Sequence, residues 1–195
     1  MSWNRFTAKD SAILLIDHQT GTMGWAKSLP FEELKRNVLM LAKTAKILNI
    51  PVVLTSSMEE YAQGPLLSEL ESILPDEFAK RVKRAGIVNA MDDEHFARAV
   101  NALGRKKLII AGVTNDVCTV YPALSLVGDG YEVQVVADAG ASPTQFADDI
   151  SLRRMEKNGV TLTSTNQVIA ELVGTWASPE GMQIVQEVVM PALQA

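Results

Sequence analysis

The residues best placed to do chemistry lie in the segment from Leu108 to Thr119. It begins with a run of apolar residues typical of a strand buried on both faces, and a turn of small residues follows. Either Asn115 or Asp116 is expected to cap a new helix. Cys118 would then lie in the first helical turn, where backbone N–H groups and the helix dipole favour the thiolate. Many α/β enzymes present a nucleophile at such a junction of strand and helix.

A catalytic cysteine usually works with a neighbouring base. The chain has two histidines. His18 directly follows Asp17 on an expected strand and would point to the opposite face, and His95 falls in an exposed helix start. A packing or surface role fits both histidines better than catalysis. A carboxylate is the other kind of base available: Asp17 could take the thiol proton, and the alternative is that Asp17 only caps the loop after the strand.

A fixed cation would balance the charge of such a carboxylate. Arg84 and Lys83 are the candidates, although isolated basic residues are more often solvated surface charges. A lone cysteine, in the same way, is more often a small buried apolar residue than a nucleophile. The position of Cys118 at the strand-to-helix junction is what favours the catalytic interpretation.

The apolar pattern predicts alternating strands and helices around these residues. We expect strands at 12–16, 52–56, around Val82, 108–111, 131–137 and 159–163. We expect helices at 31–49, 66–74, 92–103, 115–127, 143–158, 165–173 and 179–190, and a loop at 20–25. This alternation indicates an α/β protein: a three-layer α/β/α sandwich around a Rossmann-like, six-stranded, mostly parallel sheet.

The topology of such sheets brings the candidate residues together. The first and fourth strands of a doubly wound sheet lie side by side, and the crevice at their carboxyl ends is the usual site. Asp17 follows the first expected strand, and Thr114 follows the fourth. The topology therefore predicts that Asp17 and Cys118 converge although they are far apart in sequence.

Composition excludes several classes of protein. The 195 residues are 47% hydrophobic and 21% charged with a net charge of −5, which is typical of one globular domain spanning 1–195. The sequence has no basic run for nucleic acid and no apolar run of membrane-spanning length. A single cysteine cannot form an intrachain disulfide, and residues 1–6 do not form a signal-peptide pattern. We expect a soluble cytoplasmic protein that binds neither nucleic acid nor membrane.

Three segments together resemble the isochorismatase-like cysteine hydrolases. They are Ala12 to Gln19, which ends in Ile-Asp-x-Gln; Arg84 to Asp92, with the pattern Arg-x-Gly-x-x-Asn-Ala-x-Asp; and Ile109 to Pro122, which contains Gly-Val-Thr-x-x-Val-Cys. The resemblance extends over about residues 8–175 and is strongest to the YcaC-like branch, whose physiological substrate is unsettled. It implies the isochorismatase-like hydrolase fold.

By this resemblance Asp17 is the general base, Cys118 is the nucleophile and Arg84 is the basic third member of a catalytic triad. Most of the family has lysine at the third position, and a shift of one residue in the alignment would place Lys83 there. Arginine does not readily give up a proton, so its expected role is to hold charge and geometry. The resemblance also implies a cis peptide bond at Val113–Thr114.

The expected reaction is attack of Cys118 on a small amide-type substrate through a covalent thioester, with the backbone N–H groups of Thr114 and Cys118 as the oxyanion hole. Gln19, Trp25 and Asn115 are candidates for the substrate pocket. Phe31 and Tyr121 could also line it, but such aromatics more often belong to a core or a subunit interface.

Metal chemistry is not expected. Related nicotinamidases bind a metal through an Asp-x-His pair and a further histidine, and residues 55–64, the matching region, contain no histidine. Isochorismatase itself works without a cysteine nucleophile, so Cys118 disfavours that activity. We therefore expect a hydrolase without metal or other cofactor.

Two other functions remain open. One is a non-hydrolytic oligomeric protein whose thiol senses oxidants or electrophiles, although no second cysteine is present to complete a redox cycle. The other is an inactive relative that serves as a scaffold. Relatives in the branch form rings, often octamers, so the resemblance implies a homo-oligomer. The apolar C-terminal segment, 176–195, would pack on the core or on a neighbouring subunit.

Overall fold

The computed structural model describes residues 4–194. Their centre is a six-stranded sheet with the order β3-β2-β1-β4-β5-β6, and every pair of neighbouring strands is parallel. The strands are β1 (Ser11–Ile16), β2 (Val52–Ser57), β3 (Val82–Arg84), β4 (Lys107–Gly112), β5 (Glu132–Val136) and β6 (Thr161–Thr163). The predicted α/β sandwich is confirmed, and its sheet is parallel throughout.

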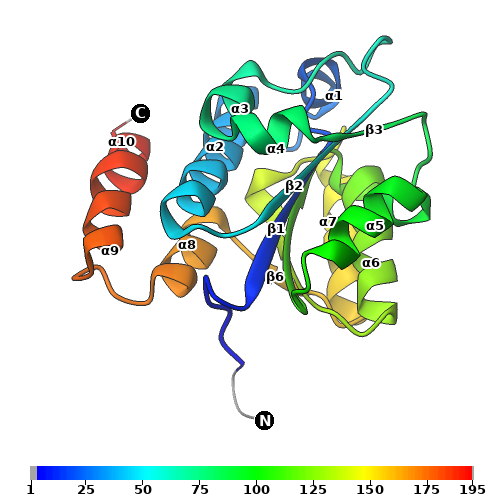
Figure 1. Cartoon of the computed structure of the whole chain (residues 1–195). Helices are drawn as coiled ribbons and strands as arrows, with labels where there is room; N and C mark the ends of the chain where they lie inside the picture. Colours follow the sequence, from blue (N-terminus) through cyan, green and yellow to red (C-terminus); the bar gives the residue numbers. More distant parts are fainter. Residues whose placement is uncertain (1–3, 195) are drawn as a thin grey trace.

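Helices cover both faces of the sheet (Figure 1). One face carries α1 (Thr20–Trp25), α2 (Phe31–Leu48), α3 (Ser68–Ile73), α4 (Pro75–Ala79) and α8 (Thr165–Val173). The other carries α5 (Glu94–Ala102), α6 (Val120–Gly128) and α7 (Gln145–Lys157). Strands covered on both faces need apolar side chains in both directions, which explains why β1 and β4 are continuous apolar runs.

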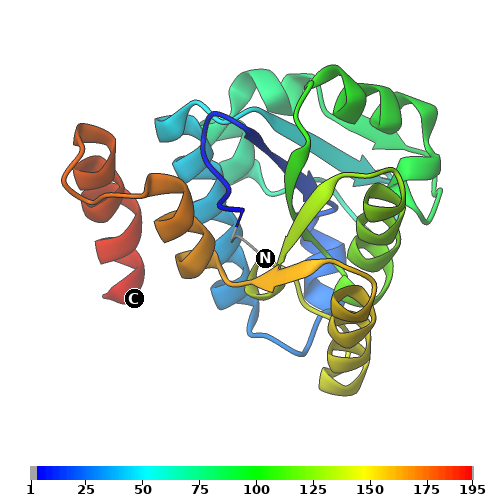
Figure 2. The same cartoon turned by 90° about the horizontal axis from the view of Figure 1, so that it is seen from below.

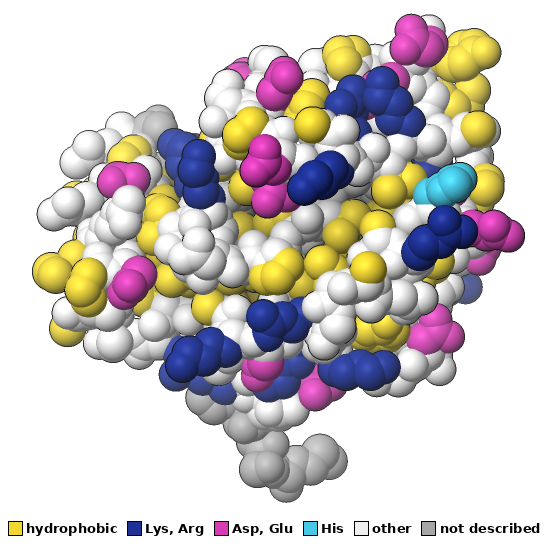
Figure 3. Space-filling view, viewed as in Figure 1, with side chains coloured by type: hydrophobic (Ala, Val, Ile, Leu, Met, Phe, Trp, Pro, Cys, Tyr) yellow, Lys and Arg dark blue, Asp and Glu magenta, His cyan; other side chains and the backbone are white. Residues whose placement is uncertain are grey.

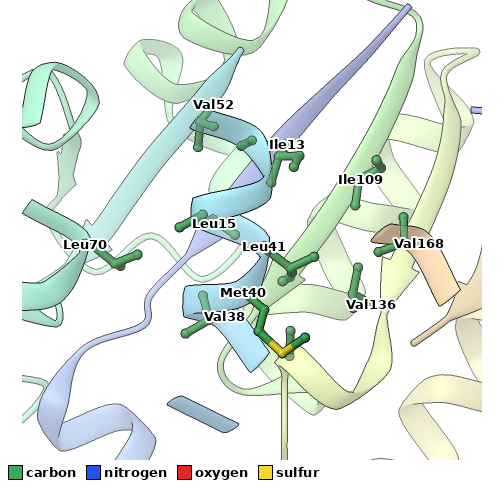
Figure 4. Packing of buried hydrophobic residues seen from close by; sticks show 14 of the residues in the cluster. Ile13, Leu15, Val38, Met40, Leu41, Val52, Leu70, Ile109, Val136 and Val168 are labelled. Carbon is green, nitrogen blue, oxygen red and sulfur yellow. The ribbon is translucent and has the colours of Figure 1, made fainter. Parts of the chain in front are cut away.

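The side chains of β1 alternate between two cores. Ile13 and Leu15 point toward α2, where they pack in one cluster with Leu41 (Figure 4). Leu14 and Ile16 belong to the cluster on the opposite face. This alternation fixes which side of the sheet each residue after β1 can reach.

The predicted neighbours β1 and β4 do pair, and Ile16 lies opposite Gly112 in the register. Both strands end at the same edge of the sheet, so Asp17 and Val113 leave it side by side. Gly112 allows the close approach of the segment that follows: a Cβ atom there would lie 2.7 Å from Oγ1 of Thr119. This edge carries the candidate residues.

The C-terminal segment forms α9 (Pro179–Ile184), a π-helical turn (Val185–Val189) and α10 (Met190–Leu193). Ile184 and Val188 are buried in the cluster that α2 shares with β1. Figure 2 shows these orange and red helices at the side of the molecule, beyond α8. Met182, Met190 and Leu193 remain exposed.

Three local predictions were wrong. Residues 20–25 form α1 instead of a loop. Pro143 precedes α7 and is not in its first turn, since the Thr144 side chain caps this helix by accepting from the N–H of Ala147. The segment after β4 begins with a π-helical turn, Asn115–Thr119, without any side-chain cap.

Two surface properties bear on partners. Within residues 4–194, no helix is long and apolar enough to cross a membrane. The face shown in Figure 3 carries basic and acidic side chains interspersed with hydrophobic ones, and neither sign of charge dominates it.

Candidate active site

A cavity of about 320 Å³ opens at the carboxyl ends of β1, β3 and β4. Asp17, Arg84 and Cys118 line it together, although they come from three separate parts of the sequence. Its apolar lining residues are Trp25, Met58, Ile87, Val88, Val117 and Pro143, and polar side chains such as Thr22, Ser57 and Gln63 line it as well. The crevice predicted from the strand order therefore exists and contains the three candidate residues.

Asp17 directly follows β1 and is almost fully buried. Its N–H donates to the carbonyl of Thr55 at 3.0 Å. Its φ of 58° lies in the left-handed region, which residues other than glycine rarely adopt. Such backbone strain is retained where the surroundings enforce it, most often at functional sites.

Arg84, the last residue of β3, holds the Asp17 carboxylate. Its Nη2 donates to both carboxylate oxygens. Its Nε donates to Oγ1 of Thr55 at 3.0 Å, and its Nη1 donates to the carbonyl of Ile87 at 2.7 Å. All three guanidinium nitrogens are thus engaged by the protein.

Lys83 does not reach this cluster. Side chains alternate along β3, so Lys83 points to the other face, where its ammonium lies 2.9 Å from the carboxylate of Glu59 and is largely exposed. Between the two candidate cations, the structure places Arg84 and not Lys83 beside Asp17.

Cys118 lies in the π-helical turn at the cavity wall. Burial raises the pKa of its thiol, and the adjacent Asp17 carboxylate raises it further. A hydrogen bond from the Thr114 backbone and the charge of Arg84 act in the opposite direction without reversing the shift in pKa. The expectation of a resting thiolate is therefore wrong: the thiol faces a carboxylate in a buried setting.

The same burial raises the pKa of the Asp17 carboxyl, while the charge and hydrogen bonds of Arg84 oppose this shift. A carboxylate with a raised pKa is a stronger base than an exposed aspartate. The pair Asp17–Cys118 can therefore transfer a proton from sulfur to oxygen when the sulfur attacks.

The peptide bond between Val113 and Thr114 is cis. The Thr114 N–H that follows it is directed at the sulfur of Cys118. The next N–H, that of Asn115, donates to the carbonyl of Ala141 at 2.9 Å. These contacts tie the turn that carries the cysteine to the segment after β5.

Asn115 does not line the cavity, contrary to the prediction. Its side chain is buried and donates to the Ala137 carbonyl at 3.2 Å and to Oδ1 of Asp148 at 3.1 Å. Asp148 also accepts from the Ser142 hydroxyl at 2.7 Å. Asn115 thus anchors the turn from behind, which also explains why it does not cap the helix.

The other pocket candidates have different roles. Gln19 lines the cavity, but its amide donates to the carbonyls of Ser57 and Gly64 and accepts from the N–H of Ser57, so it holds the loop after β2. Trp25 also lines the cavity and is partly exposed. Phe31 and Tyr121 are absent from its wall: Phe31 begins α2 and packs against the core, and Tyr121 is on α6 near Arg154.

The histidines lie outside the cavity wall. His18 is fully buried with Nε2 2.8 Å from the carbonyl of Ala139, and burial lowers its pKa to about 4. His95 is exposed at the start of α5. Among residues 4–194, no three His, Cys, Asp or Glu side chains converge in the way a metal site requires.

Sequence reasoning missed the residues that hold the site. Thr55 lies on β2 opposite Ile16, the residue before Asp17, so the strand order could have suggested it. Asp148 gave no signal, because it is a single acid on α7 that reaches Asn115 only in the folded chain. Ile87 contributes a backbone carbonyl, which its residue type does not reveal.

Comparison with known proteins shows the family and the fold of this chain. The isochorismatase domain family matches residues 11–167. The probable hydrolase YcaC of Escherichia coli K12 is 38% identical over 172 residues, which are 88% of this chain and 82% of that protein. A structure of E. coli YcaC, described as an octameric hydrolase of unknown specificity, superposes with a TM-score of 0.93 at 35% identity, covering 100% of this chain and 95% of that one.

YcaC from Pseudomonas aeruginosa, described with hexane-2,5-diol and covalent acrylamide, gives the same TM-score of 0.93 at 35% identity. The alignment covers 100% of this chain and 96% of that one. The resemblance expected from the three sequence segments is thereby confirmed. The chain belongs to the isochorismatase domain family and is similar to its YcaC members.

Proposed function

We propose that this protein is a cysteine hydrolase that cleaves the C–N bond of a small amide-type substrate through a thioester on Cys118. One observation carries the proposal: the only thiol of the chain faces a buried carboxylate, Asp17, at the end of a cavity large enough for a small molecule. A nucleophile, a base and a group that orients the base are the components such a reaction needs.

In the first half of the reaction Asp17 takes the thiol proton while the sulfur bonds to the carbonyl carbon. The N–H groups of Thr114 and Cys118 stabilise the negative charge that develops on the carbonyl oxygen. Asp17 then gives its proton to the departing nitrogen as the C–N bond breaks. An amine or ammonia leaves, and the acyl group stays on sulfur.

In the second half Asp17 takes a proton from water, and the resulting hydroxide attacks the thioester carbon. The C–S bond breaks, the carboxylic acid product leaves, and the proton held by Asp17 returns to the sulfur. Arg84 moves no proton in either half, because a guanidinium stays charged in proteins. It keeps Asp17 oriented and ionised between turnovers.

Two properties of relatives support the proposal. P. aeruginosa YcaC is described with covalent acrylamide, a small uncharged amide. E. coli YcaC is described as an octameric hydrolase, and we propose that this chain forms a homo-oligomer as well. Light scattering of the purified protein tests the oligomer, and a monomer at micromolar concentration contradicts it.

The alternative, a thiol that senses oxidants or electrophiles, fits the site less well. Sensor thiols react as exposed thiolates of low pKa, whereas burial and Asp17 raise the pKa of Cys118. A thiol that needs a base for activation suits a reaction in which substrate and base meet at the same moment.

A panel of small amides, ureas, carbamates and nitriles tests the function in wild type and in Cys118→Ala. We expect release of ammonia or amine by the wild type only, and a mass increase equal to the acyl group on Cys118 when turnover is quenched. Turnover that survives in Cys118→Ala contradicts the thioester mechanism. Peroxide adducts on Cys118 without turnover of any panel member favour the sensor.

A further inference from the structure

The charge of the cavity restricts what can enter it. Within the part of the chain that the structure describes, Arg84 is the only basic residue in the cavity wall. Its three guanidinium nitrogens already donate to Asp17, Thr55 and the Ile87 carbonyl. A carboxylate, sulfonate or phosphate on the substrate would therefore find no free cation to pair with.

The carboxylates of the cavity wall also disfavour an anionic substrate. Asp17 and Asp116 both line the cavity, so two carboxylates face a single guanidinium that is already paired. An anionic substrate would have to approach Cys118 against this excess negative charge. Repulsion between like charges at such short range disfavours this approach.

Part of the remaining wall offers apolar contacts, beside polar side chains such as Thr22 and Gln63. Trp25, Ile87, Val88 and Val117 line the cavity, and Val88 is 56% exposed at its rim. The amide of Gln19 is used in holding the neighbouring loop. With a volume of about 320 Å³, the cavity is at the small end of ligand pockets.

We propose that the site selects uncharged substrates: a short apolar acyl group on a neutral amide nitrogen, without any anionic group. Selection among substrates rests on the proposed function, but the exclusion of anions from Cys118 can be measured without turnover. It would distinguish this protein from hydrolases that hold the carboxylate of their substrate with a free arginine or lysine.

Alkylation of the single cysteine measures the exclusion directly. Iodoacetamide and iodoacetate differ mainly in charge, and both form an S–C bond to Cys118 with loss of iodide and the thiol proton. We compare the ratio of their rates in the folded protein with the ratio in the urea-unfolded chain at the same pH and ionic strength. Folding should raise the preference for iodoacetamide by about tenfold or more.

Three variants test whether charge is the cause. Asp116→Asn removes one carboxylate and should lower the preference for iodoacetamide. Val88→Lys adds a cation at the rim and should lower it too, whereas Val88→Gln, of similar length without charge, should not. A folded protein whose rate ratio equals that of the unfolded chain overturns the inference, and so does a Val88→Lys variant that behaves like Val88→Gln.

Two amides of nearly the same shape separate this inference from the proposed function. Isovaleramide is neutral, whereas malonamate carries a carboxylate in place of the isopropyl group. Turnover of isovaleramide with little or none of malonamate is the expected result. Faster turnover of malonamate than of isovaleramide refutes the inference and leaves the proposed hydrolase function standing. If no amide of the panel forms an acyl-enzyme, the hydrolase function is refuted, and the ratio of alkylation rates still tests the exclusion of anions.

Discussion

The guanidinium of Arg84 donates to both carboxylate oxygens of Asp17, although the two residues are 67 positions apart in the sequence. The side chains are only 1% and 2% exposed, so this is a buried ion pair that joins the ends of β1 and β3 across β2. Removal of one partner from such a pair leaves an uncompensated buried charge, which costs about 3–5 kcal/mol. The pair therefore couples the stability of the fold to the chemistry of Cys118.

Asp17→Asn removes the charge and the basicity of the side chain while keeping its shape. Amide turnover should fall by about 10²-fold or more, because no group then carries the proton from the thiol to the leaving nitrogen. The pKa of the Cys118 thiol should also fall, because the carboxylate that raises it is gone and Arg84 remains. Thiolate absorbance against pH measures the pKa, and ammonia release measures turnover.

A fall in turnover together with a fall in the pKa of the Cys118 thiol is the decisive result. A variant with a lower thiol pKa and unchanged turnover shows that Asp17 is not the base. Because the substitution leaves Arg84 unpaired, near-UV circular dichroism must first show that the variant is folded at the temperature of the assay. The double variant Asp17→Asn/Arg84→Gln serves as a control with neither charge.

Arg84→Lys tests whether the shape of the guanidinium matters as well as its charge. Lysine can pair with Asp17 but cannot also reach Thr55 and the Ile87 carbonyl with a planar fork. We expect a loss of about 1–3 kcal/mol in the free energy of unfolding and a clear drop in kcat/KM. The matched control is Lys83→Met, which should keep wild-type kcat/KM because Lys83 pairs with Glu59 outside the cavity. Equal losses in the two variants contradict the assignment.

The sequence was sufficient to predict which strand ends meet. The apolar runs of β1 and β4 are unambiguous, and the topology rule for doubly wound sheets places these two strands side by side, as the structure has them. The topology rule does not decide whether Arg84 or Lys83 lies beside Asp17, because adjacent residues on a strand point to opposite faces. That choice depends on the register of β3 against β2, in which Arg84 lies opposite Ser57.

The errors near Cys118 have a physical cause as well. Asn115 is a favourable capping residue, so local propensity suggested a cap or a pocket residue. Its side chain instead donates to Oδ1 of Asp148, which is 33 positions away in the sequence. This contact takes the place of the local hydrogen bond that a helix cap would make. The prediction of a thiolate was wrong for a similar reason. Burial and the Asp17 carboxylate raise the pKa of the Cys118 thiol by more than the position of Cys118 in the first helical turn lowers it.

His18 should make the fold sensitive to acid. Burial lowers its pKa to about 4 in the folded state, while an unfolded chain has the ordinary value of 6.5. Above pH 6.5 the residue is neutral in both states. Between 6.5 and about 4 only the unfolded state takes up the proton, so stability falls by about 1.4 kcal/mol per pH unit from this residue.

Urea unfolding between pH 7 and pH 5 measures this slope. His18→Gln should remove the contribution and unfold with a shallower dependence on pH, whatever its stability at pH 7. His95→Gln, at an exposed position on α5, should keep the wild-type slope. If His18→Gln and His95→Gln show the same pH dependence, protonation of His18 does not contribute.

The last prediction concerns the backbone that carries Cys118. A Cβ atom on Gly140 would lie 2.1 Å from Oδ1 of Asn115 and 2.6 Å from the carbonyl of Gly112. Gly140→Ala should therefore displace Asn115, loosen the turn and destabilise the fold by about 1–3 kcal/mol or more. Because the turn also aims Cys118 at Asp17, acylation should slow even where the variant is fully folded.

Gly24→Ala is the matched control, since a Cβ atom there would meet nothing within 4 Å and the residue lies in α1. Replacing a helical glycine with alanine usually adds about 0.5–1 kcal/mol of stability. Urea unfolding should therefore show lower stability for Gly140→Ala and higher stability for Gly24→Ala. The acylation rate of Cys118 should fall in Gly140→Ala and stay at the wild-type value in Gly24→Ala. Wild-type acylation by a folded Gly140→Ala variant would show that the contact between Gly140 and Asn115 does not position the nucleophile.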